Sequence, residues 1–206
     1  MGGKKKVISY FERQAATYLR RSERGLWKWF RQREFNEVSR LVAPQKDESL
    51  IDLGCGVGYY ATRFSQSYGM KVLGVDSSPA MLKALPREGV SGLLSEIENI
   101  AGVGTYQKAL AAGVFEFIAQ PNQVFAKCRE LVVVGGRLVL LVPRCGFFGG
   151  VYKVVHELQG CSVYLRSIAE YEALAGEFDF VLTETAYCTP ISTALAFKRK
   201  SEADLK

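Results

Sequence analysis

The feature that most constrains this chain is a short apolar run followed by glycine at alternate positions. Leu50–Leu53 is apolar except for Asp52, and Gly54, Gly56 and Gly58 follow it. A strand that ends in such glycines makes a tight turn whose backbone can approach a ligand, because no Cβ stands in the way. The helix-like segment behind the turn offers unpaired N–H groups to that ligand. The pattern therefore predicts a strand–turn–helix unit with a ligand at the turn.

The spacing of the glycines narrows the identity of the ligand. The fingerprint for NAD-type cofactors needs a further glycine at position 59, and this chain has Tyr59 there. Asp76, at the end of the next apolar run, lies about 20 residues beyond the turn, where an acid can accept hydrogen bonds from both ribose hydroxyls. These residues favour an adenosyl compound other than NAD.

Length and composition fit one globular domain with an elaboration. The chain has 206 residues, of which 48% are hydrophobic and 23% charged. No apolar run approaches the roughly 20 residues that span a bilayer. The N-terminal lysines at 4–6 precede no apolar core of the signal-peptide type. We expect a cytoplasmic protein without a membrane span.

Cysteine and histidine usage argues against a metal centre. The five cysteines form no CxxC pair, and the single histidine is His156. An odd, unpatterned set suits reduced thiols better than a zinc site or a disulfide framework, and we expect no metal. The net charge of +6 leaves several interpretations open: a solvated basic face, or attraction to an anionic substrate, an RNA or a membrane surface.

The chain divides into three parts. Residues 1–47 show helical periodicity and predict an N-terminal helical arm, with a break at residues 22–25. Residues 48–200 form the main domain, and residues 201–206 are a tail. The arm is rich in aromatic and basic residues, including Trp27 and Phe30. It can pack on the domain or act as a lid over the site, and both interpretations are open.

From residue 49 onward, strand and helix patterns alternate. Such alternation predicts a doubly wound, mostly parallel α/β sheet, and the last two strands are close enough to pair as an antiparallel hairpin. The seven predicted strands are 50–53, 71–76, 90–94, 106–112, 137–142, 180–187 and 193–200. The predicted helices are 59–68, 79–85, 121–132, 151–158 and 167–175.

In such a sheet the ligand lies at the carboxyl ends of the strands, where the strand order reverses. Glu96 follows the third strand and can take an adenine amino group, with Ile97 supplying a backbone N–H. Ala112 ends the fourth strand and permits close approach. Met81 is placed to pack on an adenine face. Each also has a simpler interpretation: Glu96 as a solvated loop acid, Met81 as a core residue and Asp76 as a helix cap.

Three motifs together carry a family resemblance. They are the glycine turn at 51–58, the strand and helix start at 72–82 and the Gly135-Gly136 turn into an apolar strand at 135–140. The arm sequence at 10–18 is similar to the start of many members. The chain resembles the class I S-adenosylmethionine-dependent methyltransferases, and looks most like the small-molecule group that includes the quinone-biosynthesis and magnesium-protoporphyrin enzymes.

The resemblance implies a Rossmann-like sheet, S-adenosyl-L-methionine as the cofactor and a set of binding residues. The glycines would accommodate the methionyl and ribose part, Ala112 would lie near the methionyl amino group, and Tyr10, Tyr18 or Arg33 near the carboxylate. The full expected cofactor-binding set is Asp52, Gly54, Cys55, Gly56, Gly58, Asp76, Ser77, Met81, Glu96, Ile97, Ala112, Tyr10, Tyr18 and Arg33.

Methyl transfer itself asks for few catalytic groups. The sulfonium is already electrophilic, so catalysis comes mainly from in-line alignment of the acceptor with the methyl group and from exclusion of water. A base is needed only if the attacking atom must lose a proton. Phe117 replaces a histidine common in the family at this strand end, so we expect Glu116 and His156 as the catalytic candidates, with Tyr152 and Arg144 as further ones.

The favoured function is methylation of a small-molecule acceptor, and the aromatic arm favours an aromatic, quinone-like or macrocyclic one. An RNA or protein methyltransferase is a second interpretation. The chain has no appended RNA-binding module and no Asn/Asp-Pro-Pro-Tyr tetrad, so we expect no nucleic-acid partner. A cofactor-binding but inactive partner protein is a third. The atom that is methylated and the oligomeric state are open.

Overall fold

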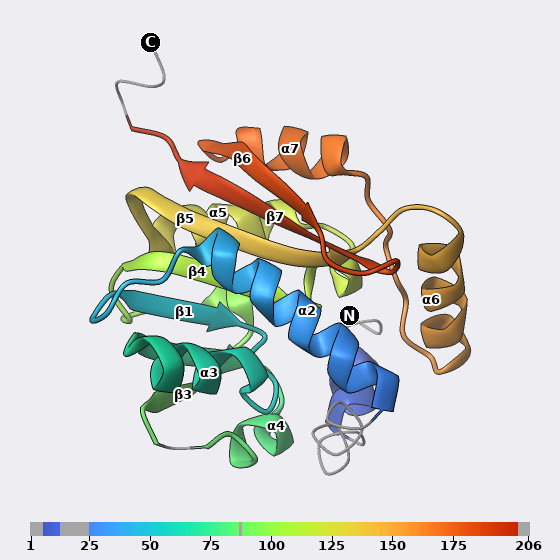
Figure 1. Cartoon of the computed structure of the whole chain (residues 1–206), viewed down its shortest axis with the longest axis horizontal. Coiled ribbons are helices and arrows are strands. Elements are labelled where there is room, and N and C mark those ends of the chain that lie inside the picture. Colours follow the sequence, from blue (N-terminus) through green and yellow to red (C-terminus); the bar gives the residue numbers. More distant parts are fainter. Residues whose placement is uncertain (1–5, 13–24, 87, 202–206) are drawn as a thin grey trace.

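A seven-stranded sheet runs through the centre of the molecule (Figure 1). The computed structural model describes residues 6–12, 25–86 and 88–201. The strands are β1 (Ser49–Leu53), β2 (Lys71–Asp76), β3 (Val90–Leu94), β4 (Tyr106–Ala112), β5 (Val132–Pro143), β6 (Phe180–Tyr187) and β7 (Ser192–Arg199). Their spatial order is β3-β2-β1-β4-β5-β7-β6.

Strand direction follows the prediction. β1 pairs in parallel with β2 and β4, β2 with β3, and β4 with β5. β7 pairs antiparallel with both β5 and β6, so the C-terminal hairpin is confirmed. The chain winds outward from β1 to β3 and then returns to place β4 on the other side of β1. The strand order reverses there, and a crevice forms at the carboxyl ends of β1 and β4.

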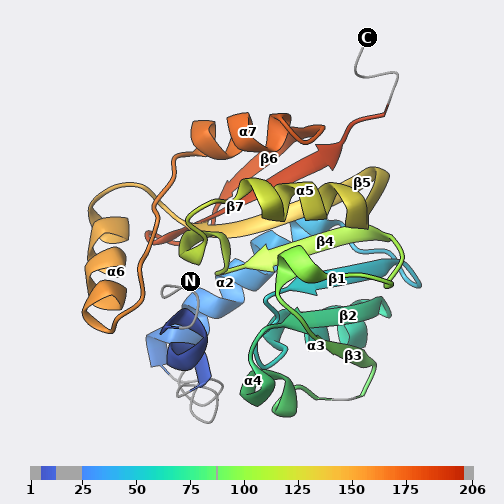
Figure 2. The same ribbon diagram turned by 180° about the vertical axis from the view of Figure 1, so that it is seen from behind.

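Helices cover both faces of the sheet. α2 and α3 lie in front in Figure 1, and α5 and α7 lie on the opposite face, which Figure 2 shows from behind. The α-helices are α2 (Gly25–Val42), α3 (Tyr59–Tyr68), α4 (Pro79–Lys83), α5 (Asn122–Leu131), α6 (Phe147–Leu158) and α7 (Ile168–Gly176). Two short 3₁₀ turns are η1 (Ile97–Asn99) and η2 (Phe115–Phe117). Residues 6–12 are helical as well.

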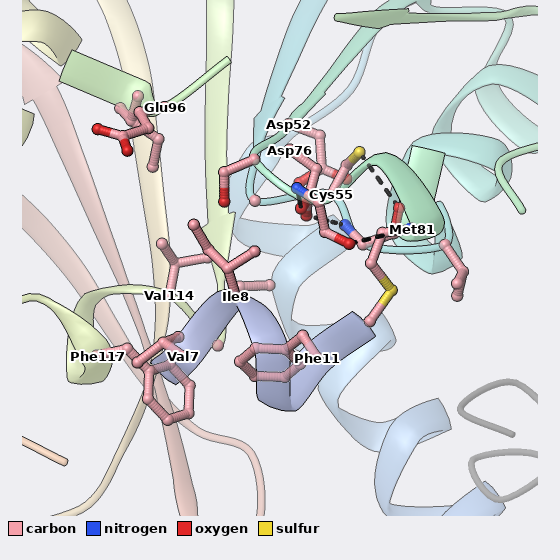
Figure 3. A pocket seen from close by; sticks show the side chains of 18 of the residues that line it. Val7, Ile8, Phe11, Asp52, Cys55, Asp76, Met81, Glu96, Val114 and Phe117 are labelled. Atoms are coloured by element: carbon pink, nitrogen blue, oxygen red, sulfur yellow. Dashed lines mark hydrogen bonds between the residues drawn. The ribbon is translucent and has the colours of Figure 1, made fainter. Parts of the chain in front are cut away.

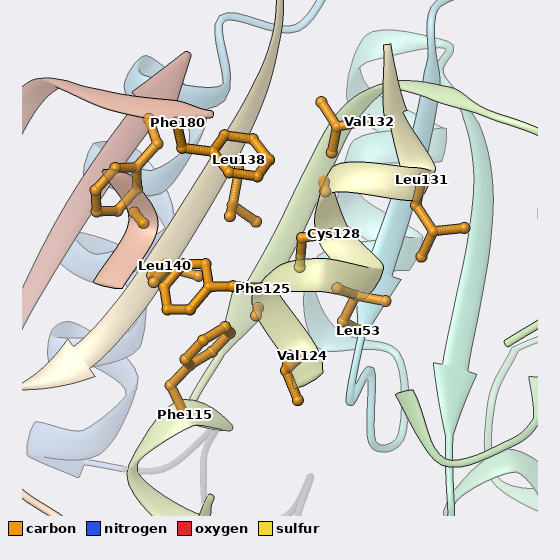
Figure 4. Close-up of a cluster of buried hydrophobic side chains, with 14 of the residues drawn as sticks. Leu53, Phe115, Val124, Phe125, Cys128, Leu131, Val132, Leu138, Leu140 and Phe180 are labelled. Atoms are coloured by element: carbon orange, nitrogen blue, oxygen red, sulfur yellow. The ribbon is translucent and has the colours of Figure 1, made fainter. Parts of the chain in front are cut away.

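Alternating strand residues supply two cores, one on each face of the sheet. On the α5 and α7 face, Phe125 packs on Leu138 and Leu140 within a fully buried cluster (Figure 4). Val139, between those two leucines in the sequence, belongs to the cluster on the α2 and α3 face. This change of face at each residue is the period of a strand buried on both sides, and it explains why β5 reads as a continuous apolar run.

The C-terminal half of α2 belongs to the core. Phe35, Val38 and Leu41 are buried against α3 and the sheet. The first turns of the same helix are different, because Trp27 keeps 60% of its surface exposed. Thus the C-terminal end of α2 packs on the domain, whereas its first turns carry the exposed Trp27.

The largest differences from the predicted elements lie in β5, α6 and residues 115–117. β5 begins at Val132, because Gly135-Gly136 lies inside the strand and does not precede it; the β4–β5 register shifts at this point. α6 begins at Phe147, four residues earlier than expected. Residues 115–117 form a 3₁₀ turn that carries Glu116. Among the described helices, none has the length and apolar character needed to cross a membrane.

Candidate active site

The glycine turn has the backbone that its sequence predicts. Gly54, Gly56 and Gly58 have φ angles of 72°, 55° and 86°, a region that favours glycine. A Cβ added at Gly54 would lie 2.5 Å from a methyl group of Val114. The turn is held to the end of β2, because Gly54 N–H donates to Val75 O at 2.8 Å. The turn therefore needs glycine both for its conformation and for the space around it.

Asp76 joins the glycine turn to the start of α4. Its Oδ2 accepts the Gly56 N–H at 2.8 Å, and its Oδ1 accepts the Ser78 N–H at 2.8 Å. The cap of α4 is Ser78, whose Oγ accepts the Met81 N–H at 3.3 Å. Burial raises the pKa of Asp76, and the backbone N–H bonds oppose that rise. Asp76 thus organises the turn without being the α4 cap, and its carboxylate keeps lone pairs for further donors.

A cavity of about 190 Å³ lies at the carboxyl ends of β1, β2 and β4 (Figure 3). Ten of the residues expected at the cofactor line it together: Asp52, Gly54, Cys55, Gly56, Asp76, Ser77, Met81, Glu96, Ile97 and Ala112. We call it the first cavity. Val7, Ile8 and Phe11 reach it from the N-terminal helical segment (Figure 3).

Asp52 is a buried carboxyl group at the base of this cavity. Only 2% of its surface is exposed, and its Oδ2 has no hydrogen-bond partner among the residues that the structure describes. Burial raises its pKa to about 7, the neighbouring Asp76 adds to that effect, and a backbone N–H bond from Ala61 opposes it. A buried oxygen without a partner costs stability unless a ligand supplies the missing donor.

A second cavity, of about 390 Å³, adjoins the first. Five lining residues are common to both cavities: Phe11, Arg31, Ala112, Gly113 and Phe117. The start of α2 contributes Trp27 and Phe30, and α6 contributes Tyr152 and His156. The two cavities therefore meet at the small residues that end β4.

Glu116 lines the second cavity, and only 2% of its surface is exposed. The Tyr152 hydroxyl donates to its Oε1 at 3.2 Å, and its Oε2 has no partner within the described part of the chain. Burial raises the pKa of Glu116 to about 7; the charge of Glu34 adds to the rise, while its own backbone N–H and Tyr152 oppose it. A carboxyl group with such a pKa can exchange a proton near neutrality.

His156 lies beside Tyr152 on α6. Its ring is 4.1 Å from the Tyr152 ring, centroid to centroid, and its Nδ1 is 3.0 Å from the Tyr152 carbonyl oxygen. The rings of Tyr10 and Phe117 lie 6.0 and 5.8 Å from it. His156 therefore forms part of an aromatic wall of the second cavity.

Three expected cofactor contacts lie outside the first cavity. Tyr10 lines the second cavity, and Gly58, the N-cap residue of α3, lines neither. Arg33 is exposed and its guanidinium lies 4.9 Å from the Trp29 ring centroid, so it does not reach either cavity. Tyr18 lies outside the described residues.

The structure adds two charged residues of α2 that sequence reasoning missed. Arg31 lines both cavities, and Glu34 lines the second. Burial raises the pKa of Glu34, while Arg31 and a hydrogen bond with Ser192 lower it. The signal was in the sequence: Trp27, Phe30, Arg31 and Glu34 follow the i, i+3, i+4, i+7 spacing of one helix face. Across the described ranges, no group of three or more His, Cys, Asp or Glu residues is placed to hold a metal.

Residues 51–140 match the family described as "Methyltransferase domain". Relatives in sequence include a tRNA U34 carboxymethyltransferase of Shewanella putrefaciens, 30% identical over 57% of this chain and 36% of its own length. The enzyme of the same name from Shewanella loihica is 29% identical over 87% of this chain and 55% of its own length. The chain thus spans between about a third and just over half of the length of these relatives.

Solved structures share the fold. Magnesium protoporphyrin IX methyltransferase from Synechocystis, with bound S-adenosylhomocysteine, superposes with a TM-score of 0.78 at 19% identity, over 96% of this chain and all of that one. A putative methyltransferase of Haloferax volcanii, in complex with the Trm112 activator, has a TM-score of 0.78 at 13% identity, over 93% of this chain and 98% of that one. At these identities the likeness is one of fold.

Proposed function

We propose that this chain, whose residues 51–140 match a methyltransferase domain, is a class I S-adenosylmethionine-dependent methyltransferase that methylates a small molecule held in the second cavity. S-adenosylmethionine, the cofactor of the family, supplies a methyl group on an electrophilic sulfonium. The proposal rests on one observation above all. A cavity with a buried carboxyl group, Glu116, adjoins the first cavity at Ala112 and Gly113.

The lining of the first cavity carries the groups that the cofactor needs. The glycine turn lets the ligand approach the backbone at places where a Cβ would meet neighbouring side chains. Asp76, held by two backbone N–H groups, has acceptor capacity for ribose hydroxyls. The unpartnered Oδ2 of Asp52 can accept from a cationic or N–H group of the ligand. We assign ribose binding to Asp76 and the adenine edge to Glu96 and Ile97.

Glu116 is the base in this proposal. The attacking atom of the acceptor loses its proton to Glu116 Oε2 as it forms a bond to the methyl carbon, and the electron pair of the breaking C–S bond goes to sulfur. Tyr152 holds the Glu116 carboxylate through Oε1, and Oε2, which has no partner among the described residues, keeps its lone pairs for the proton. His156 serves to position Tyr152 and to form the aromatic wall. Arg31, at the boundary of the two cavities, is placed to hold the cofactor carboxylate in the role expected for Arg33.

The second cavity suits a flat, largely apolar acceptor. Its volume of about 390 Å³ lies within the range of about 300–1,000 Å³ that is typical of small-molecule sites. Trp27, Phe30 and Phe117 supply aromatic surface on which a ring can stack. Glu116 and Tyr152, which are hydrogen-bonded to each other, would orient the atom that is methylated.

A label-transfer experiment tests the proposal. The protein is incubated with methyl-labelled S-adenosylmethionine and either a fractionated metabolite extract or total RNA. We expect label in a small aromatic compound, lost with Glu116→Gln and kept with Glu172→Gln, an exposed glutamate on α7. Absence of transfer to any fraction, with cofactor binding intact, would contradict the proposal and favour an inactive cofactor-binding protein.

RNA is the second candidate acceptor. It is favoured by the name of the Shewanella relatives and by the net charge of +6. The aligned part is only 36% of the S. putrefaciens protein, so the RNA-contacting parts of that protein need not have counterparts here. Label found in RNA alone would select this candidate over the small molecule.

A further inference from the structure

α6 turns its apolar face toward solvent. Phe147 and Leu158, at its two ends, are 81% and 84% exposed. The remaining exposed apolar residues of the helix lie between them at helical spacing. Together they form one stripe, which we call the α6 stripe: Phe147, Phe148, Val151, Val154, Val155 and Leu158. Amphipathic helices of globular proteins normally bury such a stripe. In α6 the apolar face points away from the core, which we call its inverted orientation.

The inverted orientation is built into the contacts of α6. Gly149 faces inward so closely that a Cβ there would lie 1.8 Å from the Arg144 carbonyl oxygen. Two polar residues of the helix, Tyr152 and His156, line the second cavity. Rotation of the stripe toward the core would remove these contacts and force a larger residue than glycine against the backbone. The exposed stripe is therefore a fixed feature of the fold.

The start of α2 continues the apolar surface. Trp27 and Trp29 keep 60% and 50% of their surface exposed. Trp27 also lines the second cavity, as Tyr152 of α6 does, so the two helices flank the same cavity. Both views of the ribbon place α6 and the start of α2 at the same end of the molecule (Figures 1 and 2).

Charge on this end is positive. Residues 25–33 contain Lys28, Arg31 and Arg33 and no acidic residue. On α6, Lys153 and Glu157 form an ion pair at 3.7 Å and cancel each other. The whole chain has a net charge of +6. A cationic surface with exposed tryptophan and phenylalanine matches an anionic lipid interface, where apolar side chains enter the acyl boundary and basic ones meet the headgroups.

We propose that the α6 stripe and the start of α2 dock the protein on the surface of an anionic lipid bilayer. The apolar stripe lies in the interface plane, and Lys28 and Arg33 contact lipid headgroups. Docking sets the second cavity beside the bilayer, so an apolar acceptor dissolved in the lipid would reach it without crossing water. This last consequence rests on the proposed function, whereas docking itself does not.

Vesicle co-sedimentation with the full chain tests the docking surface. The probes are large unilamellar vesicles of phosphatidylcholine alone and of phosphatidylcholine with phosphatidylglycerol. The stripe variant is Phe147→Asp with Leu158→Asp, and the charge variant is Lys28→Glu with Arg33→Glu. The control is Val134→Asp with Val181→Asp, which places two aspartates at exposed valines of β5 and β6. Far-ultraviolet circular dichroism and S-adenosylhomocysteine binding verify that each variant is folded.

We expect the unmodified chain and the control to bind the anionic vesicles. The stripe variant should bind more than about tenfold more weakly, because two large apolar side chains leave the interface. The charge variant should lose the preference for phosphatidylglycerol. The proposal is overturned if the unmodified chain does not bind anionic vesicles, or if the stripe variant binds as the control does. Self-association through the stripe without vesicle binding would also overturn it. Failure of label transfer would leave this result unaffected, because vesicle binding needs neither cofactor nor acceptor.

Discussion

The pH dependence of stability around Glu116 provides a sharp prediction. The ordinary pKa of this carboxyl group is 4.5, and burial raises it to about 7 in the fold. Between these values the folded protein keeps a proton that the unfolded chain has lost. The free energy of unfolding therefore falls as pH rises through this window. At about 1.36 kcal/mol per pKa unit, ionised Glu116 costs the fold about 3 kcal/mol above pH 8.

Glu116→Gln removes this cost, because the amide is neutral at every pH and similar in shape to the protonated acid. Relative to the unmodified protein, the variant should gain about 2–3 kcal/mol in free energy of unfolding between pH 5 and pH 8. Urea denaturation followed by circular dichroism at both pH values measures this gain. Asp52 titrates in both proteins, so its contribution cancels. The same variant should lose about 10²–10⁴-fold in methyl-transfer rate.

Glu172→Gln is the matched control, since Glu172 is exposed on α7 and its substitution should leave the pH dependence of stability unchanged. A stability difference between Glu116→Gln and the unmodified protein that stays the same from pH 5 to pH 8 would refute the reasoning. So would a variant that is less stable than the unmodified protein at pH 8. Either result would mean that ionisation of Glu116 does not lower the free energy of unfolding.

Four further substitutions have defined outcomes. Gly149→Ala should destabilise the protein by about 1–3 kcal/mol, because its Cβ would lie 1.8 Å from a backbone oxygen. Gly150→Ala next to it meets no atom within 4 Å and should be neutral or stabilising by up to about 1 kcal/mol in thermal denaturation. Gly58→Ala should cost about 1–3 kcal/mol in the same assay, since its φ is 86° and its Cβ would lie 2.2 Å from a leucine methyl. Tyr152→Phe removes a hydrogen bond that lowers the pKa of Glu116, so the acidic limb of the rate–pH profile should move to higher pH. A profile unchanged by this substitution would argue against Glu116 as the base.

Local signals predicted most of the sheet. Apolar runs bounded by glycine or proline marked the strands, and β2, β3, β4 and β6 have the predicted bounds. The start of β5 was missed because Gly135-Gly136 resembles a turn. In the structure these glycines continue the strand through an irregularity in its pairing with β4. Such a position depends on tertiary contacts, which periodicity does not contain.

The first cavity was easier to predict than the second. Residues of the first cavity follow strand ends directly, as Asp76 does, so the topology rule gathers them in space. The second cavity is built from α2, η2 and α6, which are far apart in the sequence and meet only through packing. Glu34 and Arg31 illustrate the difference. Their helix face could be predicted, but its proximity to Glu116 could not.

Calorimetric titration with S-adenosylhomocysteine tests most directly the division of the site into a cofactor cavity and an acceptor cavity. The titration compares the unmodified protein, Asp76→Ala and Glu116→Gln. Asp76→Ala should weaken binding by at least about 100-fold. The substitution removes the hydrogen bonds from the ribose hydroxyls to a carboxylate, and hydrogen bonds to a charged group contribute about 1.5–3 kcal/mol each. Glu116→Gln should bind as the unmodified protein does. Unchanged affinity with Asp76→Ala, or an equal loss with both variants, would contradict the assignment of the two cavities.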